Sequence, residues 1–157
     1  MQTRYTTLID CAPEQLWPWL EEPDKQKQWM KGLLDNVSTS EGPARVGSTF
    51  RMTIQEGRRV ATYEGEITNY DLHRRLSIRV WGEALRGVEI AVEYQLQDLG
   101  GRTRLDYISV ADMTEAGFFM KLMMPLYKLF STIQLKQFMK TLKHLAEAEA
   151  AQAKVPA

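Results

Sequence analysis

The chain has 157 residues and a mass of 18.1 kDa, and its 20 Lys plus Arg residues are balanced by 20 Asp plus Glu residues. This length allows one domain with a substantial core, and the balanced charge argues against a nucleic-acid-binding protein. Cys11 is the only cysteine, which excludes an internal disulfide framework and a multi-cysteine metal site.

The N-terminal sequence MQTRYTTLID lacks the basic and apolar segments of an export signal, and no run of about 18 apolar residues occurs in the chain. Together with the single cysteine, these features predict a cytoplasmic protein. We expect one domain over residues 1–150 and a disordered tail over residues 151–157.

The first part of the chain predicts a short strand followed by two short helices. Residues 4–10 are rich in β-branched side chains, and Pro13 then stands where the first turn of a helix tolerates proline. Pro18 and Pro23 would break or kink a longer helix. Residues 13–31 are therefore predicted to form two brief helices that end near Gly32.

Apolar and polar residues then alternate as in a half-buried sheet. VGSTFRMTIQEGRRVATYEGEI (46–67) predicts two strands joined at Glu56-Gly57. Further strands are predicted in RRLSIRVWG (74–82), VEIAVEYQLQD (88–98) and RTRLDYISVAD (102–112), the last two joined at Gly100-Gly101. Counting residues 4–10 and a strand near 34–39, the pattern predicts about seven mostly antiparallel strands with one apolar face.

After Asp112 the pattern becomes helical, with Asp112 or Thr114 as the expected cap and an end near residue 150. The stripe expected to face the sheet consists of Phe119, Met123, Tyr127, Phe130, Phe138, Leu142 and Leu145. Five lysines are expected on the opposite side: Lys121, Lys128, Lys136, Lys140 and Lys143. The apolar arc is broader in the first half, FFMKLMMPLYKLF (118–130), where Pro125 should bend the helix.

This order of elements, and two local motifs, resemble the START/Bet v 1-like helix-grip superfamily, also called SRPBCC, which includes polyketide cyclase/dehydrase and lipid-transport proteins. The motifs are IDCAPEQLWPWLEEPDKQKQW (9–29), similar to the family's strand-to-helix entry, and VGSTFRM (46–52), similar to its third strand. The close of the last helix, LKHLAEA (142–148), is also similar. The resemblance implies an α+β helix-grip fold, in which a curved antiparallel sheet wraps around the long C-terminal helix and leaves a cavity.

The sequence contains no catalytic or cofactor motif that we could identify, such as a nucleophile elbow, a phosphate-binding loop or a dinucleotide-binding turn. Cys11 lies beside a helix N-terminus, which could activate its thiol, although a buried inert thiol is the commoner case. His73 and His144 have no neighbouring ligand at metal-binding spacing. We therefore expect no cofactor and no metal.

Several polar residues fall among the apolar ones on the inner face, and a buried phenol or amide needs a partner. Tyr63, Tyr94, Tyr107, Ser109 and Gln134 are therefore candidates to contact each other, water or a ligand. The expected ligand-binding residues are Phe50, Met52, Tyr63, Ile67, Ile78, Tyr94, Tyr107, Phe119, Met123, Leu126, Tyr127, Phe130 and Gln134.

These observations favour a protein that binds a small hydrophobic molecule, such as a lipid or a polyketide-like compound, between the sheet and the last helix. The first alternative is a cyclase, aromatase or dehydratase-like enzyme that uses the same cavity and its tyrosines. The second is a cochaperone-like interaction module with the lysine stripe as its docking face. A transient membrane contact through the apolar helix start, and a monomer or homodimer, complete the expectations.

Overall fold

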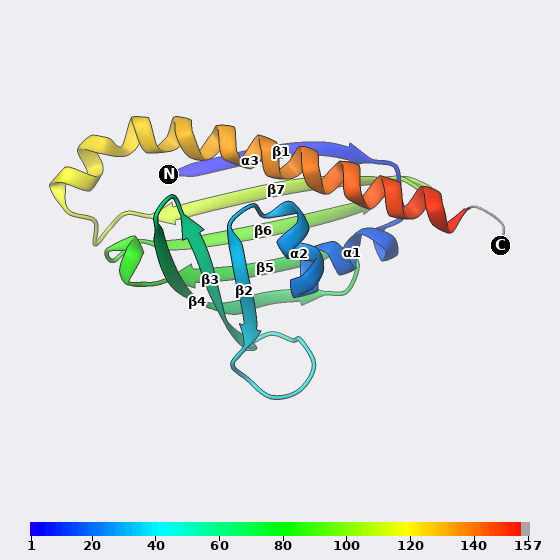
Figure 1. The fold of residues 1–157 in the computed structure, drawn as a ribbon, viewed down its shortest axis with the longest axis horizontal. Helices are drawn as coiled ribbons and strands as arrows, with labels where there is room; N and C mark the ends of the chain where they lie inside the picture. The colour runs from blue at the N-terminus through cyan, green and yellow to red at the C-terminus, as the bar shows by residue number, and fades with distance from the viewer. Residues whose placement is uncertain (155–157) are drawn as a thin grey trace.

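Seven antiparallel strands and one long helix make up most of the chain in the computed structural model, which describes residues 1–154 (Figure 1). The elements in chain order are β1 (Gln2–Ile9), α1 (Pro13–Glu21), α2 (Pro23–Trp29), β2 (Leu33–Ser38), β3 (Thr49–Glu56), β4 (Arg59–Asp71), β5 (Arg75–Trp81), the short 3₁₀ helix η1 (Glu83–Leu85), β6 (Glu89–Asp98), β7 (Thr103–Asp112) and α3 (Phe118–Ala153).

The sheet has the order β1-β7-β6-β5-β4-β3-β2, and every neighbouring pair is antiparallel. Strands β2 to β7 each lie beside their neighbour in sequence, whereas β1 pairs with β7, with Gln2 opposite Val110 and Ile9 opposite Thr103. Helix α3 runs along the sheet, and α1 and α2 lie at one end of it (Figure 1). The predicted helix-grip architecture is confirmed.

The two short helices pack through tryptophans. Pro13 and Pro23 begin α1 and α2, as their fixed φ angle favours. Trp17 and Trp19 are buried, and the Trp29 indole N–H donates a hydrogen bond to the Trp19 carbonyl at 2.8 Å. Trp29 is 3% exposed and belongs to the core.

Two features of β4 shape the inner face of the sheet. A register shift between Ile67 and Asn69 in the pairing with β5 is a bulge, which bends a strand and increases its twist. Gly65 stands opposite Phe50 of β3, and a Cβ atom at Gly65 would lie 2.2 Å from the Phe50 ring. The absence of a side chain at Gly65 thus leaves the space that the Phe50 ring occupies against β4.

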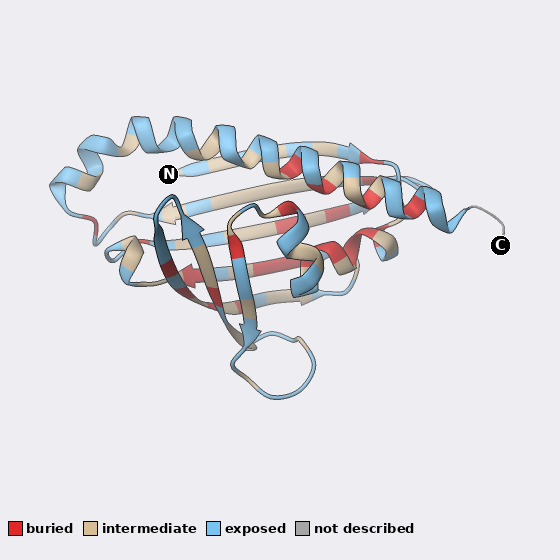
Figure 2. Cartoon of the chain, viewed as in Figure 1, coloured by how far each residue is buried: buried red, intermediate tan, exposed pale blue. Residues whose placement is uncertain are grey.

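The main core lies at the end of the sheet that carries α1, α2 and the second half of α3. Its most deeply buried members include Ile9, Leu16, Leu105, Met139 and Leu142. A second, smaller cluster forms between β2, β3, β4 and β5. Figure 2 shows buried residues concentrated around the second half of α3 and the short helices, while the first half of α3 is almost entirely exposed.

Helix α3 differs from the predicted helix at both ends. Its N-cap is Gly117, without a side-chain cap, so the predicted caps were wrong. Asp112 instead accepts hydrogen bonds from Thr114, from its backbone N–H at 2.9 Å and its hydroxyl at 2.5 Å, in the turn before α3. At the other end α3 continues to Ala153, into the segment predicted to be a tail, of which residues 155–157 lie outside the described residues. No helix within residues 1–154 is long and apolar enough to cross a membrane.

Candidate functional site

A cavity of about 490 Å³ lies between the inner face of the sheet, α1, α2 and the first half of α3. Its wall is mainly apolar because the inward positions of β3, β4, β5 and β6 carry aliphatic and aromatic side chains. Nine of the thirteen predicted site residues line it: Phe50, Met52, Tyr63, Ile67, Ile78, Tyr94, Tyr107, Tyr127 and Gln134. Ser109 is outside this lining.

The other four predicted site residues, all on α3, do not line the cavity. Phe119, Met123, Leu126 and Phe130 have exposed fractions of 69%, 40%, 62% and 68%. The less exposed side of the first half of α3 instead carries Met120, Met124, Ser131, Thr132 and Leu135. Of the predicted stripe in this half, only Tyr127 lines the cavity; Phe119, Met123 and Phe130 were wrongly placed. Apolar residues occupy most of the helix circumference, so their spacing does not identify an inner side.

One end of the cavity carries a tyrosine–carboxylate pair. The Tyr63 hydroxyl of β4 donates a close hydrogen bond to Glu56 Oε1 at the end of β3. Burial, followed by this hydrogen bond, raises the pKa of Tyr63 well above its usual range. Burial and then the charge of Glu56 also raise the pKa of Tyr127 on α3. Both phenols therefore remain protonated near neutral pH and can donate or accept hydrogen bonds.

A second pair lies near the short helices. The Tyr70 hydroxyl donates to Glu21 Oε1 at 2.7 Å, and the Trp17 indole N–H donates to Glu21 Oε2 at 2.9 Å. Burial, then the hydrogen bond to Glu21, raises the pKa of Tyr70. Beside this pair, the Asn36 amide donates to Gln26 Oε1 at 2.7 Å, and both of these side chains line the cavity.

The sequence interpretation missed the polar lining residues Glu21, Gln26, Asn36, Glu56 and Tyr70. Glu56 had been assigned only to a turn. Gln26 lies in a short helix whose polar and apolar residues show no period that identifies an inner side. The alternation of β4 predicts that Tyr70 points outward, but the bulge in β4 reverses its direction. A search for carboxylates at strand ends beside inward-facing tyrosines would have found Glu56.

The middle of the cavity contains two tyrosine rings that contact each other edge-to-face. Tyr94 of β6 and Tyr107 of β7 stand opposite each other in register, with ring centroids 5.4 Å apart in an edge-to-face arrangement. Burial raises the pKa of both tyrosines, so both are neutral. Around them the wall is formed by Ile67, Leu76, Ile78 and Val92. An apolar ligand would thus contact these side chains between two polar ends.

The other candidate reactive groups are placed away from this cavity or are inactive. Cys11 is 1% exposed, and burial, aided by the charge of Glu147, raises its pKa to about 11, so its thiol is protonated and the activation considered from the sequence is contradicted. The ring of His73 lies edge-to-face with the ring of Trp17, with the ring centroids 6.0 Å apart. Among residues 1–154, no group of three His, Cys, Asp or Glu side chains is arranged to hold a metal ion.

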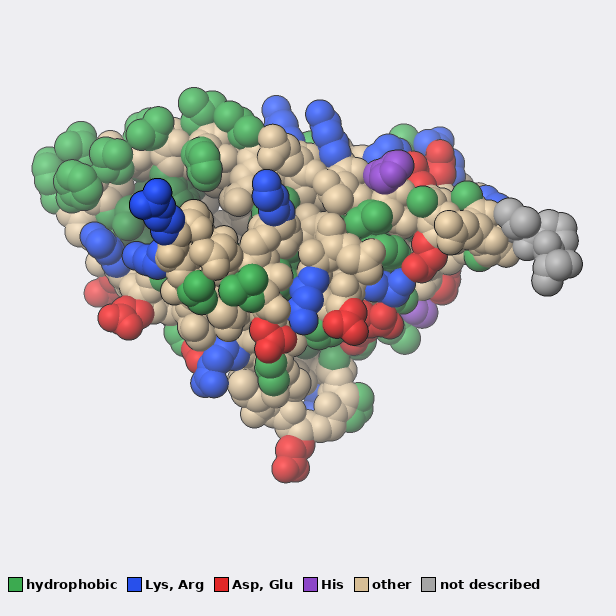
Figure 3. All heavy atoms as spheres, in the orientation of Figure 1, with side chains coloured by type: hydrophobic (Ala, Val, Ile, Leu, Met, Phe, Trp, Pro, Cys, Tyr) green, Lys and Arg blue, Asp and Glu red, His purple; other side chains and the backbone are tan. Residues whose placement is uncertain are grey.

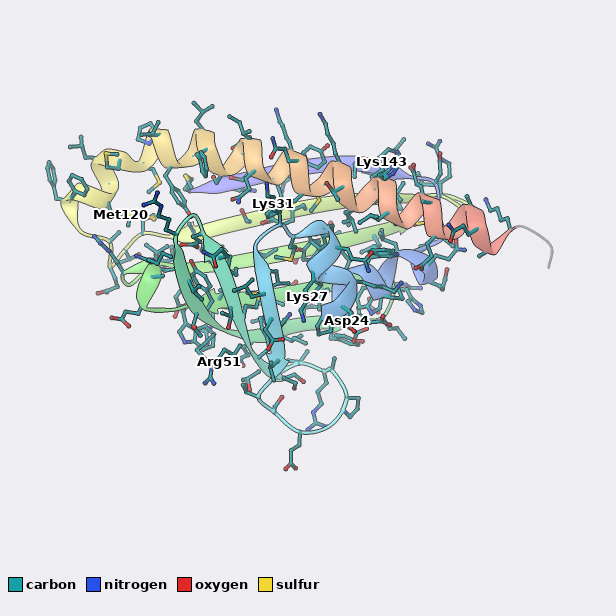
Figure 4. All side chains as sticks on the ribbon, in the orientation of Figure 1. Asp24, Lys27, Lys31, Arg51, Met120 and Lys143 are labelled. Atoms are coloured by element: carbon teal, nitrogen blue, oxygen red, sulfur yellow. The ribbon has the colours of Figure 1, made fainter. Side chains whose placement is uncertain are left out.

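A larger hollow of about 890 Å³ lies where the β4–β5 turn meets the polar side of β6 and β7. Acidic and basic residues mix in its wall, including Asp71, Arg74, Arg75 and Asp106. The opposite face of β3 and β4 is similarly polar: Arg51 points away from the cavity and pairs with Glu64 at 2.7 Å (Figure 4). The mixed charge of the hollow gives no preference for one class of ligand, so we assign the candidate site to the apolar cavity.

Known structures share this fold at low sequence identity. TTHA0849 from Thermus thermophilus is 14% identical, with a TM-score of 0.75 over 96% of this chain and 99% of that one. The ZhuI aromatase/cyclase from Streptomyces sp. R1128 is 13% identical, with a TM-score of 0.74 over 94% and 93%. Ara h 8.0201 is 10% identical, with a TM-score of 0.67 over 90% and 97%. These similarities establish the fold.

Sequence comparison gives the family. No curated protein matches the chain. Residues 1–147, however, match the family described as polyketide cyclase / dehydrase and lipid transport, which agrees with the resemblance in the N-terminal and third-strand motifs. With the helix-grip fold and a mainly apolar cavity also present, the chain belongs to the polyketide cyclase/dehydrase and lipid-transport family, within the START/Bet v 1-like superfamily.

Proposed function

We propose that this protein binds a small hydrophobic molecule, of the lipid or polyketide-like type, in the cavity between the sheet and α3. The observation that carries the proposal is the cavity itself: about 490 Å³, within the range of about 300–1,000 Å³ that is usual for ligand sites. Its apolar wall with a few polar groups at defined places suits such a ligand. A cytoplasmic location and a monomeric or dimeric state remain part of this prediction.

Native mass spectrometry of the purified protein, followed by extraction of any bound compound, tests the proposal directly. We expect a co-purifying apolar molecule of a few hundred daltons, and a rise in melting temperature when it is added back. Val92→Phe, which fills the cavity from β6, should abolish that rise, whereas Val110→Phe on an exposed position of β7 should not. An unliganded protein whose melting temperature responds to no apolar compound would contradict the proposal.

An enzyme of the cyclase or dehydratase type is the second candidate, and the Glu56–Tyr63 pair favours it. A carboxylate that holds a phenol at the wall of an apolar cavity can accept a proton while the phenol donates one to a developing oxyanion. If the extracted compound is a substrate, Tyr63→Phe and Glu56→Gln should each lower kcat by roughly 100-fold or more and leave binding nearly unchanged. Turnover by these variants equal to that of the wild type would exclude this pair as the catalytic groups, and no turnover by the wild type would leave binding alone as the function.

The partner proposed for the exposed side of α3 is an anionic membrane surface, from which an apolar ligand could be taken. Exposed apolar residues gather there: Phe118, Phe119, Leu122, Met123, Leu126, Leu129, Phe130 and Ile133. Figure 3 shows this apolar surface over the start of α3, with basic side chains along the neighbouring part of the molecule. An exposed apolar surface of this kind is typical of a contact site.

Charge favours a membrane over a second copy of the chain. Between residues 116 and 146 there are five lysines and no Asp or Glu. Seven-residue spacing places Leu122, Leu129 and Lys136 on the same side of the helix, so the outward side changes from apolar to basic along its length. Amphipathic helices bind anionic membranes by inserting apolar side chains into the lipid while nearby lysines contact the charged headgroups. A dimer interface would require only the apolar side chains.

Flotation with vesicles of phosphatidylcholine, with and without phosphatidylglycerol, tests this contact. The triple variant Phe118→Ser, Leu122→Ser, Phe130→Ser should lose at least roughly tenfold in binding to the anionic vesicles. The matched control changes three exposed apolar residues elsewhere, Val46→Ser, Val60→Ser and Leu72→Ser, and should bind as the wild type. A wild-type dimer that the first triple variant dissociates would identify a second copy as the occupant and overturn the membrane contact.

A further inference from the structure

The charged residues that line the cavity are all of one sign. Within residues 1–154, the lining includes the carboxylates Glu21 and Glu56 and no Lys, Arg or His. We infer that the cavity selects neutral molecules that carry hydroxyl groups and discriminates against carboxylate anions such as free fatty acids. This inference rests on the proposed ligand-binding function and narrows its ligand class.

The two carboxylates lie toward opposite ends of the cavity. Glu56 accepts its hydrogen bond from Tyr63, and Glu21 accepts one from Tyr70, both tyrosines being on β4. Seven residues of strand separate these tyrosines, which corresponds to roughly 20 Å. A long ligand that fills the apolar middle therefore meets a carboxylate at either end, whichever way round it enters.

Hydrogen bonding explains why a hydroxyl group suits these ends. Glu56 accepts from Tyr63 through Oε1, and within the described part of the chain no side chain donates to its Oε2. A ligand hydroxyl can donate to this oxygen, and a charged acceptor gives roughly twice the strength of a neutral one. Tyr94, Tyr107 and Gln134 offer further neutral donors and acceptors along the wall.

A carboxylate ligand has no comparable partner. Its charge would lose water on entry, and a buried anion without a counter-charge is costly. The basic residues nearby do not supply that counter-charge at the wall. Arg59 stands opposite Glu56 in the β3–β4 register but is absent from the lining, and among the groups that shift the pKa of Tyr63 it has the smallest effect. Arg51 pairs with Glu64 on the opposite face of the sheet. Repulsion by Glu21, which is partly buried, adds to the cost, and repulsion by the exposed Glu56 adds less because solvent screens it.

Matched pairs of compounds test the selection. Isothermal titration or thermal-shift measurements at pH about 7.5, where a free carboxylic acid is ionised, would compare dodecyl alcohol with dodecanoic acid and 1-naphthol with 1-naphthoic acid. We expect the alcohol of at least one pair to bind at least tenfold more tightly than its acid. The double variant Glu21→Gln, Glu56→Gln should raise acid binding by roughly tenfold or more and so reduce the preference.

Glu64→Gln is the matched control, because it removes a carboxylate next to Tyr63 on the same strand but on the opposite face. It should leave the preference for the alcohol unchanged. Equal binding of acid and alcohol by the wild type, or an unchanged preference in the double variant, would overturn the inference while leaving ligand binding intact. Failure of every compound to bind, together with an empty cavity by native mass spectrometry, would instead overturn the proposed function.

Discussion

The first half of α3 is richer in large apolar side chains than the second half, yet it is the second half that is buried. In the second half, Met139, Leu142, Ala146 and Ala150 are almost completely buried against β1, α1 and α2. There Lys143 also donates hydrogen bonds to the Leu8 carbonyl at 2.5 Å and to Glu147 at 2.6 Å (Figure 4). In the first half, Tyr127 and Gln134 reach the cavity, while most other side chains face solvent.

This difference separates stability from function along one helix. Burial of the second half supplies hydrophobic stabilisation, which is proportional to the apolar area removed from water. The first half adds little burial, so its apolar residues are available for contacts with a ligand or a surface. Mutations in the second half should therefore mainly lower stability, whereas mutations in the first half should mainly change contacts with a ligand or a surface.

The largest expected effect is a loss of stability in the second half. Leu142→Ala removes a side chain with 0% exposure and should lower the free energy of unfolding by about 2–5 kcal/mol. Leu129→Ala, in the first half and 61% exposed, should change it by no more than about 0.5 kcal/mol. Urea denaturation followed by circular dichroism measures both, and equal destabilisation would contradict the division of α3.

A substitution in β4 tests the wall of the cavity. Gly65→Ala places a methyl group against the Phe50 ring, so the ring must move and the protein should lose about 1–3 kcal/mol of stability. Because Phe50 lines the cavity, ligand affinity should change as well. Glu66→Ala, at the next position of β4 and on its polar side, is the control for stability and affinity. An unchanged affinity in Gly65→Ala would show that the Phe50 ring is not in contact with the ligand.

Alkaline pH should lower the stability of the protein through Cys11, which is buried in the core beside the second half of α3. Its pKa is about 11 in the folded protein against 9.0 for an unperturbed thiol, so between these values the unfolded state binds fewer protons. Stability should therefore fall as pH rises through this window, by up to about 3 kcal/mol from this residue. Comparing the pH dependence of unfolding in wild type and Cys11→Ala isolates the contribution, and parallel curves would refute it.

The smallest expected effect is a difference in local opening. Lys121 and Lys128 lie in the exposed half of α3, and Lys143 lies in the half packed on the core. Brief trypsin treatment under native conditions should cut at the first two positions before the third, because sparsely packed segments open at lower free energy. Mass spectrometry of the first fragments gives the order, and added ligand should slow cleavage if α3 covers it. Cleavage at Lys143 before Lys121 and Lys128 would contradict the conclusion that the first half of α3 opens more easily than the second half.

Most of the sheet could be predicted because strand alternation has a simple period. Inward positions such as Met52, Tyr63 and Ile78 follow directly from it. Tyr70 could not be assigned, since the bulge after Ile67 shifts the alternation by one residue, and a bulge has no reliable signature in a single sequence. The orientation of α3 was missed for a different reason: its first half is apolar around most of its circumference, with one side carrying Lys121 and Lys128, so tertiary packing selects the inner side.

The position of β1 has a consequence for how the chain folds during synthesis. Strand β1 emerges from the ribosome before the other strands of the sheet, yet within residues 1–154 it pairs only with β7, about one hundred residues later, with Tyr5 opposite Tyr107. Pairings between distant segments form slowly because the intervening loop must close. The nascent β1 strand therefore remains unpaired, and accessible to chaperones, until β7 has been synthesised. The sheet can be completed only after its last strand in sequence has emerged.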